Sequence, residues 1–238
     1  MEIIGKKMNM KMKTMKKIDG NMKKERKIYV VGGSKSYANW MEPSFITNDI
    51  TNADLVLFTG GEDVTPALYG ESENPRTGNN LDRDMKELEE FKKAKELGLP
   101  LIGICRGSQF ACVLAGGKLV QHQQNPLYLH PIKLINGEEI IITSTHHQAQ
   151  YPYLLPEDNY KLIGWTNGIS KMHEGGNEEE MSLPDGKEAE IVYYPKIKAL
   201  AIQGHPESLF QDYGTRPSVN KTIDYLRGLL DDLMENKL

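Results

Sequence analysis

The chain has 238 residues, of which 39% are hydrophobic, and this is enough apolar material to bury one good core. Its formal net charge of −4 argues against a general nucleic-acid-binding protein. No apolar run approaches the about 20 residues that a membrane-spanning helix requires. The two cysteines cannot make a disulfide framework, so we expect a reducing compartment and place the protein in the cytoplasm.

The first 26 residues differ from the rest, because lysines and methionines dominate them. They contain no apolar central region, which excludes a secretory signal. A basic arm for nucleic acid or an acidic partner is one interpretation. Charge-rich segments usually stay solvated, so we expect either a disordered extension over 1–26 or an open reading frame that begins too far upstream of Met22.

Two apolar segments predict the first strands, over 27–32 and 54–59. The loop over 33–36 that follows the first strand has no phosphate-binding pattern. The second strand ends on Gly60 and Gly61. Glycines at the mouth of a sheet leave backbone N–H groups open to a ligand, although a plain tight turn explains them as well.

Residues 80–97 predict an amphipathic helix that Gly98 ends. Arg83 and Asp84 stand at its start, and we interpret them as structural and not catalytic. The strand–helix–strand order implies a right-handed crossover and a parallel sheet. The apolar face of this helix is predicted to carry Leu81, Met85, Leu88, Phe91, Ala94 and Leu97.

A buried strand over 101–104 is predicted to turn at Cys105 into a helix over 108–115. Gly103 and Gly107 flank the cysteine in the spacing of a nucleophile elbow. They let the backbone turn tightly and leave the approach to the thiol clear. The amino end of the following helix favours the thiolate, which is the form that attacks. A buried structural cysteine is the alternative.

An apolar strand that starts at Ala199 delivers His205, and Glu207 follows it. Residues i and i+2 of an extended segment point the same way. Glu207 can therefore hydrogen-bond one ring nitrogen of His205 and leave the other nitrogen free to take a proton from Cys105. We interpret the three residues as a catalytic triad, against the alternative of a capping histidine beside a surface carboxylate.

The other elements are less informative. His122 and His130 are assigned to loops. The acidic, Gly-rich segment 172–187 is expected to be a solvated loop in preference to a mobile lid. Ser218 is expected to cap the closing helix. Further strands are predicted over 138–143, 160–165 and 190–194, and the closing helix over 218–235.

The strand over 138–143 brings His146 and His147 to the same rim as Cys105. Paired histidines suggest a metal site, but neighbours in an extended segment point in opposite directions. No cysteine or carboxylate stands at metal-ligand spacing, so we expect no metal.

Together, these motifs resemble the class I glutamine amidotransferase superfamily and, within it, the γ-glutamyl hydrolase branch that includes γ-glutamyl-γ-aminobutyrate hydrolases. The resemblance covers roughly Lys27 to the C-terminus. Ser108, Thr143 and Gly204 depart from the residues usual in this branch, and we expect each beside the substrate pocket. Five motifs carry the resemblance in the order of the family: Thr59 to Glu71, Arg83-Asp84, Gly103 to Gln109, Ser144 to Gln148, and His205 to Glu207.

The resemblance implies an α/β fold with a central, mostly parallel sheet and helices on both faces, a flavodoxin-like three-layer sandwich with its site at the carboxyl ends of the strands. Residues 27–238 would form a single catalytic domain. Backbone N–H groups of Gly60 or Gly61 and of Arg106 would form an oxyanion hole.

It also implies substrate contacts. Gln109, one helical turn past Cys105, would line the pocket and contact the glutamyl head, although it could instead cap its own helix. His146, His147 and Gln148 would help to hold the α-amino and carboxylate groups of the substrate.

These features predict acyl transfer to water: Cys105 attacks the γ-glutamyl amide of a small molecule, and the thioester is hydrolysed to glutamate without a cofactor. The alternative is a glutaminase subunit that passes ammonia to a separate synthetase, for instance in nucleotide biosynthesis. A third possibility is a catalytically silent binding module. We expect no membrane or nucleic-acid partner, and a homodimer is possible.

Overall fold

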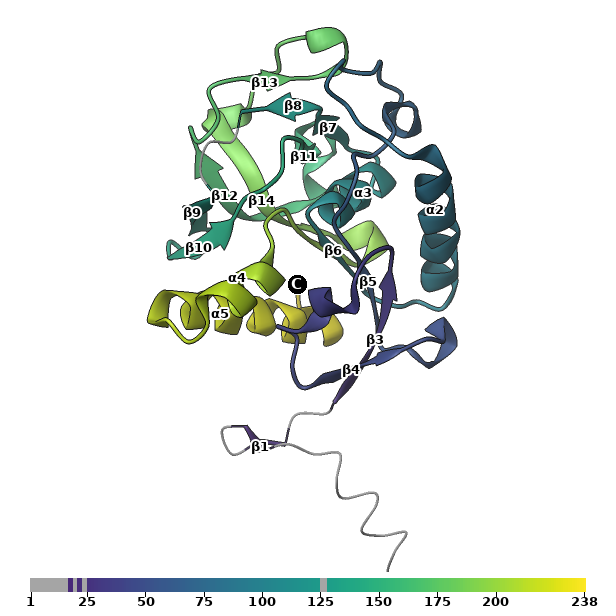
Figure 1. The fold of residues 1–238 in the computed structure, drawn as a ribbon, viewed down its shortest axis with the longest axis vertical. Helices are drawn as coiled ribbons and strands as arrows, with labels where there is room; N and C mark the ends of the chain where they lie inside the picture. The colour runs from purple at the N-terminus through teal and green to yellow at the C-terminus, as the bar shows by residue number, and fades with distance from the viewer. Residues whose placement is uncertain (1–16, 19–20, 23–24, 125–127) are drawn as a thin grey trace, which may run out of the picture.

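A computed structural model describes residues 17–18, 21–22, 25–124 and 128–238 of the chain. Within them, nine strands form one sheet that has helices on both faces (Figure 1). This arrangement confirms the predicted three-layer α/β fold. Of the extension predicted over 1–26, only the start of β3 and an antiparallel ladder between β1 (Lys17–Ile18) and β2 (Asn21–Met22) lie within the described residues.

The half of the sheet that carries the site is parallel, in the order β15-β6-β5-β3-β4. Val56 on β5 pairs with Leu101 on β6, so the helix between these strands makes the predicted parallel crossover. Strands β15, β6 and β5 are buried along their whole length, as expected where helices cover both faces. The strands are β3 (Arg26–Val31), β4 (Ser44–Thr47), β5 (Leu55–Phe58), β6 (Leu101–Ile104) and β15 (Ala199–Ile202).

The other half of the sheet is antiparallel, in the order β10-β9-β12-β14, with β14 beside β15. His130 lies on β9 and not in the predicted loop, and it contacts buried Glu190 at 3.2 Å. His130 points inward in alternation with Ile132 and Leu134, but a histidine followed by a proline hides this pattern in the sequence. The strands are β9 (Leu129–Leu134), β10 (Glu139–Thr143), β12 (Lys161–Asn167) and β14 (Lys187–Tyr194).

Two short antiparallel ladders stand apart from the main sheet, β7 with β11 and β8 with β13. The loop assignment of His122 is wrong as well, because this residue lies on β8. A strand of two residues is too short for any periodicity to reveal it. The strands are β7 (Lys118–Val120), β8 (His122–Gln123), β11 (Ala149–Tyr151) and β13 (His173–Glu174).

The closing helix begins one residue earlier than predicted. Arg216 occupies the cap position and Pro217 the first turn, so Ser218 is not the cap. Proline is favoured at the first helical position because its missing N–H has no partner there in any case. The α-helices are α2 (Leu81–Glu96), α3 (Arg106–Leu114), α4 (Pro206–Tyr213) and α5 (Pro217–Met234). Single 3-10 turns lie at Lys35–Ala38, Ile50–Asn52, Pro66–Tyr69, Pro152–Leu154, Glu157–Asn159, Gly176–Glu178, Pro184–Gly186 and Pro195–Ile197.

Helix α2 is rotated relative to the predicted amphipathic face. Leu81 and Met85, predicted to face the core, are 50% and 46% exposed, whereas the acidic Asp84 and Glu87 are buried. The partner for both carboxylates is the guanidinium of Arg106, which is itself buried. A buried charge needs such a partner, so the ionic contact fixes the rotation of this turn of the helix.

The apolar core has two layers, one on each face of the sheet. Alternate residues of β5 enter different layers: Leu57 packs with α5, and Val56 packs with α2 and α3. No helix in the described ranges is long and apolar enough to cross a membrane.

Leu226 on α5 is fully buried in the first of these layers. We expect Leu226→Ala to lower the free energy of unfolding by about 2–5 kcal/mol, because a cavity adds to the lost apolar burial. Leu154→Ala is the matched control, since Leu154 is 62% exposed and its truncation should change stability by less than about 0.5 kcal/mol. Urea unfolding measures both, and equal losses would contradict this description of the core.

Candidate active site

Cys105 lies at the junction of β6 and α3 in a strained backbone conformation, with φ 54° and ψ −111°. Positive φ costs a residue with a side chain about 1–3 kcal/mol and persists only where the surroundings enforce it. The backbone N–H of Cys105 continues the sheet by donating to the Ile202 carbonyl at 2.9 Å. The thiol of Cys105 therefore lies where the carboxyl end of β6 meets the amino end of α3.

The two predicted glycines permit a close approach of backbone segments. A Cβ on Gly103 would stand 2.2 Å from the Gly107 carbonyl oxygen, and one on Gly107 would stand 2.2 Å from the Phe58 carbonyl oxygen. Neither position can hold a larger residue without moving the backbone. Both glycines therefore fix the elbow against β5.

His205 and Glu207 meet as predicted, but not for the predicted reason. The ring Nδ1 of His205 lies 2.6 Å from Glu207 Oε1. The segment between them is not extended: His205 caps α4 and Glu207 lies in its first turn. Pro206 at the first helical position starts that turn, so the carboxylate folds back onto the ring of the capping residue.

The side chains of Cys105 and His205 lie next to each other, since a Cβ on Gly60 would stand 3.5 Å from Cys105 Cβ and 3.2 Å from His205 Cε1. Burial lowers the pKa of His205, but the neighbouring Cys105 and Glu207 outweigh this effect and raise the pKa to about 10. The three residues predicted as a triad therefore lie together, with the His205 ring close to a sulfur and a carboxylate.

Thr143, at the end of β10, also fixes the position of His205. Its hydroxyl accepts from the His205 backbone N–H and donates to the His205 carbonyl, each at 3.0 Å. This side chain joins the antiparallel half of the sheet to the proposed base.

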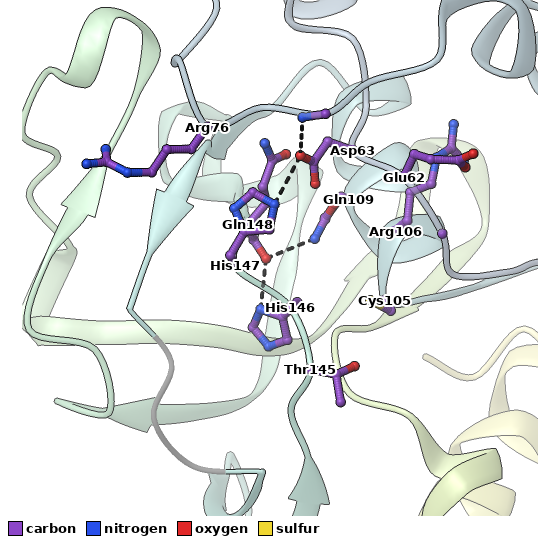
Figure 2. Close-up of a pocket in the computed structure, with 12 residues that line it drawn as sticks. Glu62, Asp63, Arg76, Cys105, Arg106, Gln109, Thr145, His146, His147 and Gln148 are labelled. Carbon is purple, nitrogen blue, oxygen red and sulfur yellow. Dashed lines mark hydrogen bonds and ion pairs between the residues drawn. The ribbon is translucent and has the colours of Figure 1, made fainter.

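A pocket of about 270 Å³ opens beside Cys105 (Figure 2). Gly60 lies next to His205 and Tyr37, because a Cβ there would stand 3.2 Å from His205 Cε1 and 2.7 Å from the hydroxyl oxygen of Tyr37. No sequence pattern indicated Tyr37. The centroid of its ring lies 6.0 Å from the centroid of the His205 ring. Of the predicted site residues, the pocket is lined by Gly61, Cys105, Arg106, Gln109, His146, His147 and Gln148.

The backbone carbonyl of Gln148 links two other residues of the pocket wall. It accepts from Gln109 Nε2 at 2.9 Å and lies 2.8 Å from His146 Nδ1. Gln109 therefore links the elbow helix to the wall through its side chain. Burial lowers the pKa of His146 to about 3, so the ring is neutral and its Nε2 is an acceptor.

His147 points away from His146 and towards Asp63 (Figure 2). Its Nε2 lies 3.1 Å from Asp63 Oδ2, and this contact raises the pKa of His147. Asp63 also accepts from the Gly78 N–H at 2.8 Å. The sequence alone assigned no role to Asp63, although it stands inside the motif that follows Gly60 and Gly61.

Arg76 is a further pocket residue that no sequence signal indicated. Its Nη1 pairs with Glu174 Oε2 at 2.9 Å and with Glu178 Oε1 at 3.0 Å. Both carboxylates belong to the acidic segment that was expected to be a solvated loop. Part of that segment therefore borders the pocket through Arg76.

The three departures from the family pattern lie behind the wall of the pocket and not beside the substrate space. Ser108 is fully buried and donates to the Cys105 carbonyl at 2.6 Å. A Cβ on Gly204 would stand 2.3 Å from Ile142 Cγ1, so the close packing of β10 leaves no room for a side chain. With Thr143, they support the nucleophile and the base.

The fold is that of class I glutamine amidotransferases. A glutamine amidotransferase from Thermotoga maritima superposes with a TM-score of 0.53 at 12% identity, covering 89% of this chain and 97% of that one. The Peptidase C26 profile matches residues 3–133, and the profile of glutamine amidotransferase class-I matches residues 77–225. The chain therefore belongs to the peptidase C26 family of class I glutamine amidotransferase-like proteins.

Two relatives illustrate the range of the family. The glutamine amidotransferase-like protein YvdE of Lactococcus lactis is 32% identical over 179 residues, which are 70% of this chain and 71% of that protein. The γ-glutamyl-γ-aminobutyrate hydrolase of Escherichia coli O157:H7 is 25% identical over 188 residues, which are 72% of this chain and 71% of that protein.

The contact between His205 and Glu207 can be tested by titration. We expect His205 to titrate near pH 10, and Glu207→Gln to lower its pKa towards 6.5, because the imidazolium loses an anionic partner. The raised pKa also contributes stability that is complete below pH 6.5 and is lost as the pH rises through about 10.

NMR titration of the histidine rings measures this shift. His147, whose partner is Asp63, is the internal control and should not move in the Glu207→Gln variant. A His205 ring that titrates near 6.5 in the wild-type chain would contradict the contact.

Proposed function

We propose that the chain is a cysteine-dependent hydrolase that cleaves the γ-glutamyl amide bond of a small molecule and releases glutamate and an amine. The observation that carries the proposal is the cluster of Cys105, His205 and Glu207, in which Cys105 also lines a pocket of about 270 Å³. Membership of the peptidase C26 family supports the same class of reaction.

In the proposed reaction the Cys105 sulfur attacks the γ-carbonyl carbon while His205 holds the thiol proton. Backbone N–H groups of Gly61 and Arg106 receive the negative charge that develops on the carbonyl oxygen. When the C–N bond breaks, His205 gives its proton to the leaving amine. Water then attacks the thioester with His205 as base, and glutamate leaves as the thiol re-forms.

The walls of the pocket supply groups for the glutamyl head. The carboxylate of Asp63, which lines the pocket, is an acceptor suited to an α-ammonium group. His147, with its raised pKa, offers a cation for the α-carboxylate. Arg76 is already paired with Glu174 and Glu178, so the mouth of the pocket does not favour a leaving group with many negative charges.

The second candidate is a glutaminase subunit that delivers ammonia to a synthetase. The name of one structural neighbour, the glutaminase domain of Trypanosoma brucei CTPS, is consistent with this role. A silent binding module is disfavoured, since it would have no need of a strained cysteine beside a histidine–carboxylate pair.

Release of glutamate by the purified chain tests the proposal. The substrates are glutamine, γ-glutamyl-γ-aminobutyrate, other γ-glutamyl amines and a γ-glutamyl peptide. We expect turnover of a γ-glutamyl amine and poor use of glutamine. Feeble activity on glutamine alone would favour the ammonia donor, and inactivity on every substrate would overturn the proposal.

Replacement of the nucleophile gives a second test. We expect Cys105→Ala to lower kcat by at least about 1,000-fold while the circular dichroism spectrum is unchanged. Cys112→Ala is the matched control, because Cys112 is fully buried and burial raises the pKa of its thiol to about 12. Undiminished turnover in Cys105→Ala would contradict the mechanism.

A further inference from the structure

Beneath the elbow, helix α2 carries a buried carboxylate that bonds two arginines. Glu87 accepts from Arg83 Nε through Oε1, at 2.8 Å, and from Arg106 Nη1 through Oε2. Asp84, one turn earlier, accepts from Arg106 Nη2. The side chains of Asp84, Glu87 and Arg106 are all at least 98% buried, so these contacts operate with little screening by water.

The other end of this group reaches the glycine loop. Arg83 Nη2 donates to the Gly60 carbonyl at 2.8 Å. That carbonyl belongs to the same peptide unit as the Gly61 N–H, and the unit is trans, so the two groups point in opposite directions. An arginine that holds the oxygen on the α2 side therefore turns the N–H of Gly61 to the other side.

The loops pack tightly on the same arginine. A Cβ on Gly61, whose φ is +145°, would stand 1.8 Å from Arg83 Nη1, and one on Gly32 would stand 2.8 Å from Arg83 Nη2. Gly32 follows β3, Gly61 follows β5 and Arg106 follows β6. One charged group thus braces the carboxyl ends of three neighbouring strands.

We propose that Arg83, Glu87 and Arg106 form a strut that sets the relative orientation of the two oxyanion-binding N–H groups. Arg83 positions the peptide of Gly61, Arg106 anchors the turn that bears its own N–H, and Glu87 holds the two arginines together. The inference rests on the proposed function, because it assigns these N–H groups to the oxyanion. Arg83 and Glu87 are then positioning residues.

A strut of this kind affects the transition state more than the ground state. The carbonyl oxygen gains its charge only during attack, so misaligned donors lower kcat while KM changes little. Alkylation of Cys105 by iodoacetamide is a displacement at carbon that forms no oxyanion. Its rate should therefore be independent of the strut, although it depends on His205 and on the elbow.

The test compares Arg83→Met with Lys93→Met in the full chain. Lys93 also makes an ion pair on α2, with Glu90 at 2.8 Å, but at the exposed far end of the helix. We expect Arg83→Met to lower kcat by about 10- to 100-fold, with KM and the alkylation rate within about twofold of wild type. Lys93→Met should match wild type in all three measurements.

Arg83→Lys is a second variant that keeps the test valid if Arg83→Met does not fold. Lysine keeps the charge but cannot donate along the guanidinium fork to Gly60 and Glu87 together, so its kcat should fall to a value between those of wild type and Arg83→Met. A kcat for Arg83→Lys equal to that of wild type would overturn the strut.

The remaining outcomes separate the two proposals. Wild-type turnover with an unchanged kcat in Arg83→Met would overturn the strut alone. A parallel fall of kcat, alkylation rate and melting temperature would also overturn it, since this is what a purely structural brace predicts. Absence of turnover in the wild-type chain on every γ-glutamyl substrate would overturn the proposed function and the strut with it.

Discussion

The site depends on the strained, positive-φ backbone of Cys105. This conformation is held in place where β5, β6 and α3 approach one another closely at Gly103 and Gly107. The strain at the cysteine is therefore held by packing of main chain against main chain. The position of the proposed nucleophile is therefore determined by the core and not by the pocket.

The position of the proposed base, His205, is also set by the sheet. His205 lies just past the end of β15, which is hydrogen-bonded to β6, so nucleophile and base emerge from adjacent parallel strands. Glu207 orients the ring from within α4, and Thr143 fixes the backbone of His205 from β10. Both halves of the sheet thus meet at one histidine, and the antiparallel half has a role in the site besides extending the sheet.

The sequence was most informative where local pattern and local structure coincide. The apolar run before Cys105 and the flanking glycines predict the elbow, because a strand, a turn and a helix each have their own short-range signal. The pairing of His205 with Glu207 was predicted correctly, but from an extended geometry that the chain does not adopt. A proline at the start of α4 is a helix signal, and in this short segment it outweighs the alternation of a strand.

The sequence does not predict contacts between residues that are distant along the chain. As charged residues, Asp84 and Glu87 would be assigned to the solvent side of helix α2, and their contacts with the buried guanidinium of Arg106 explain why they are buried. Likewise, Arg76 enters the pocket through ion pairs with residues about a hundred positions away, for which periodicity gives no signal. The antiparallel strand β9 was hidden because His130 and Pro131 interrupt its apolar alternation.

The pairing of β15 with β6, in which Ile202 stands opposite Ile104, has a consequence for how such a protein can change. Because side chains alternate across a sheet, a slip of one residue would send every side chain of β15 to the opposite layer of the core. Selection for a folded core therefore also preserves the alignment of cysteine and histidine. Pocket residues such as Arg76 and His147 lie outside that constraint, so they can change while the spacing of Cys105 and His205 stays the same.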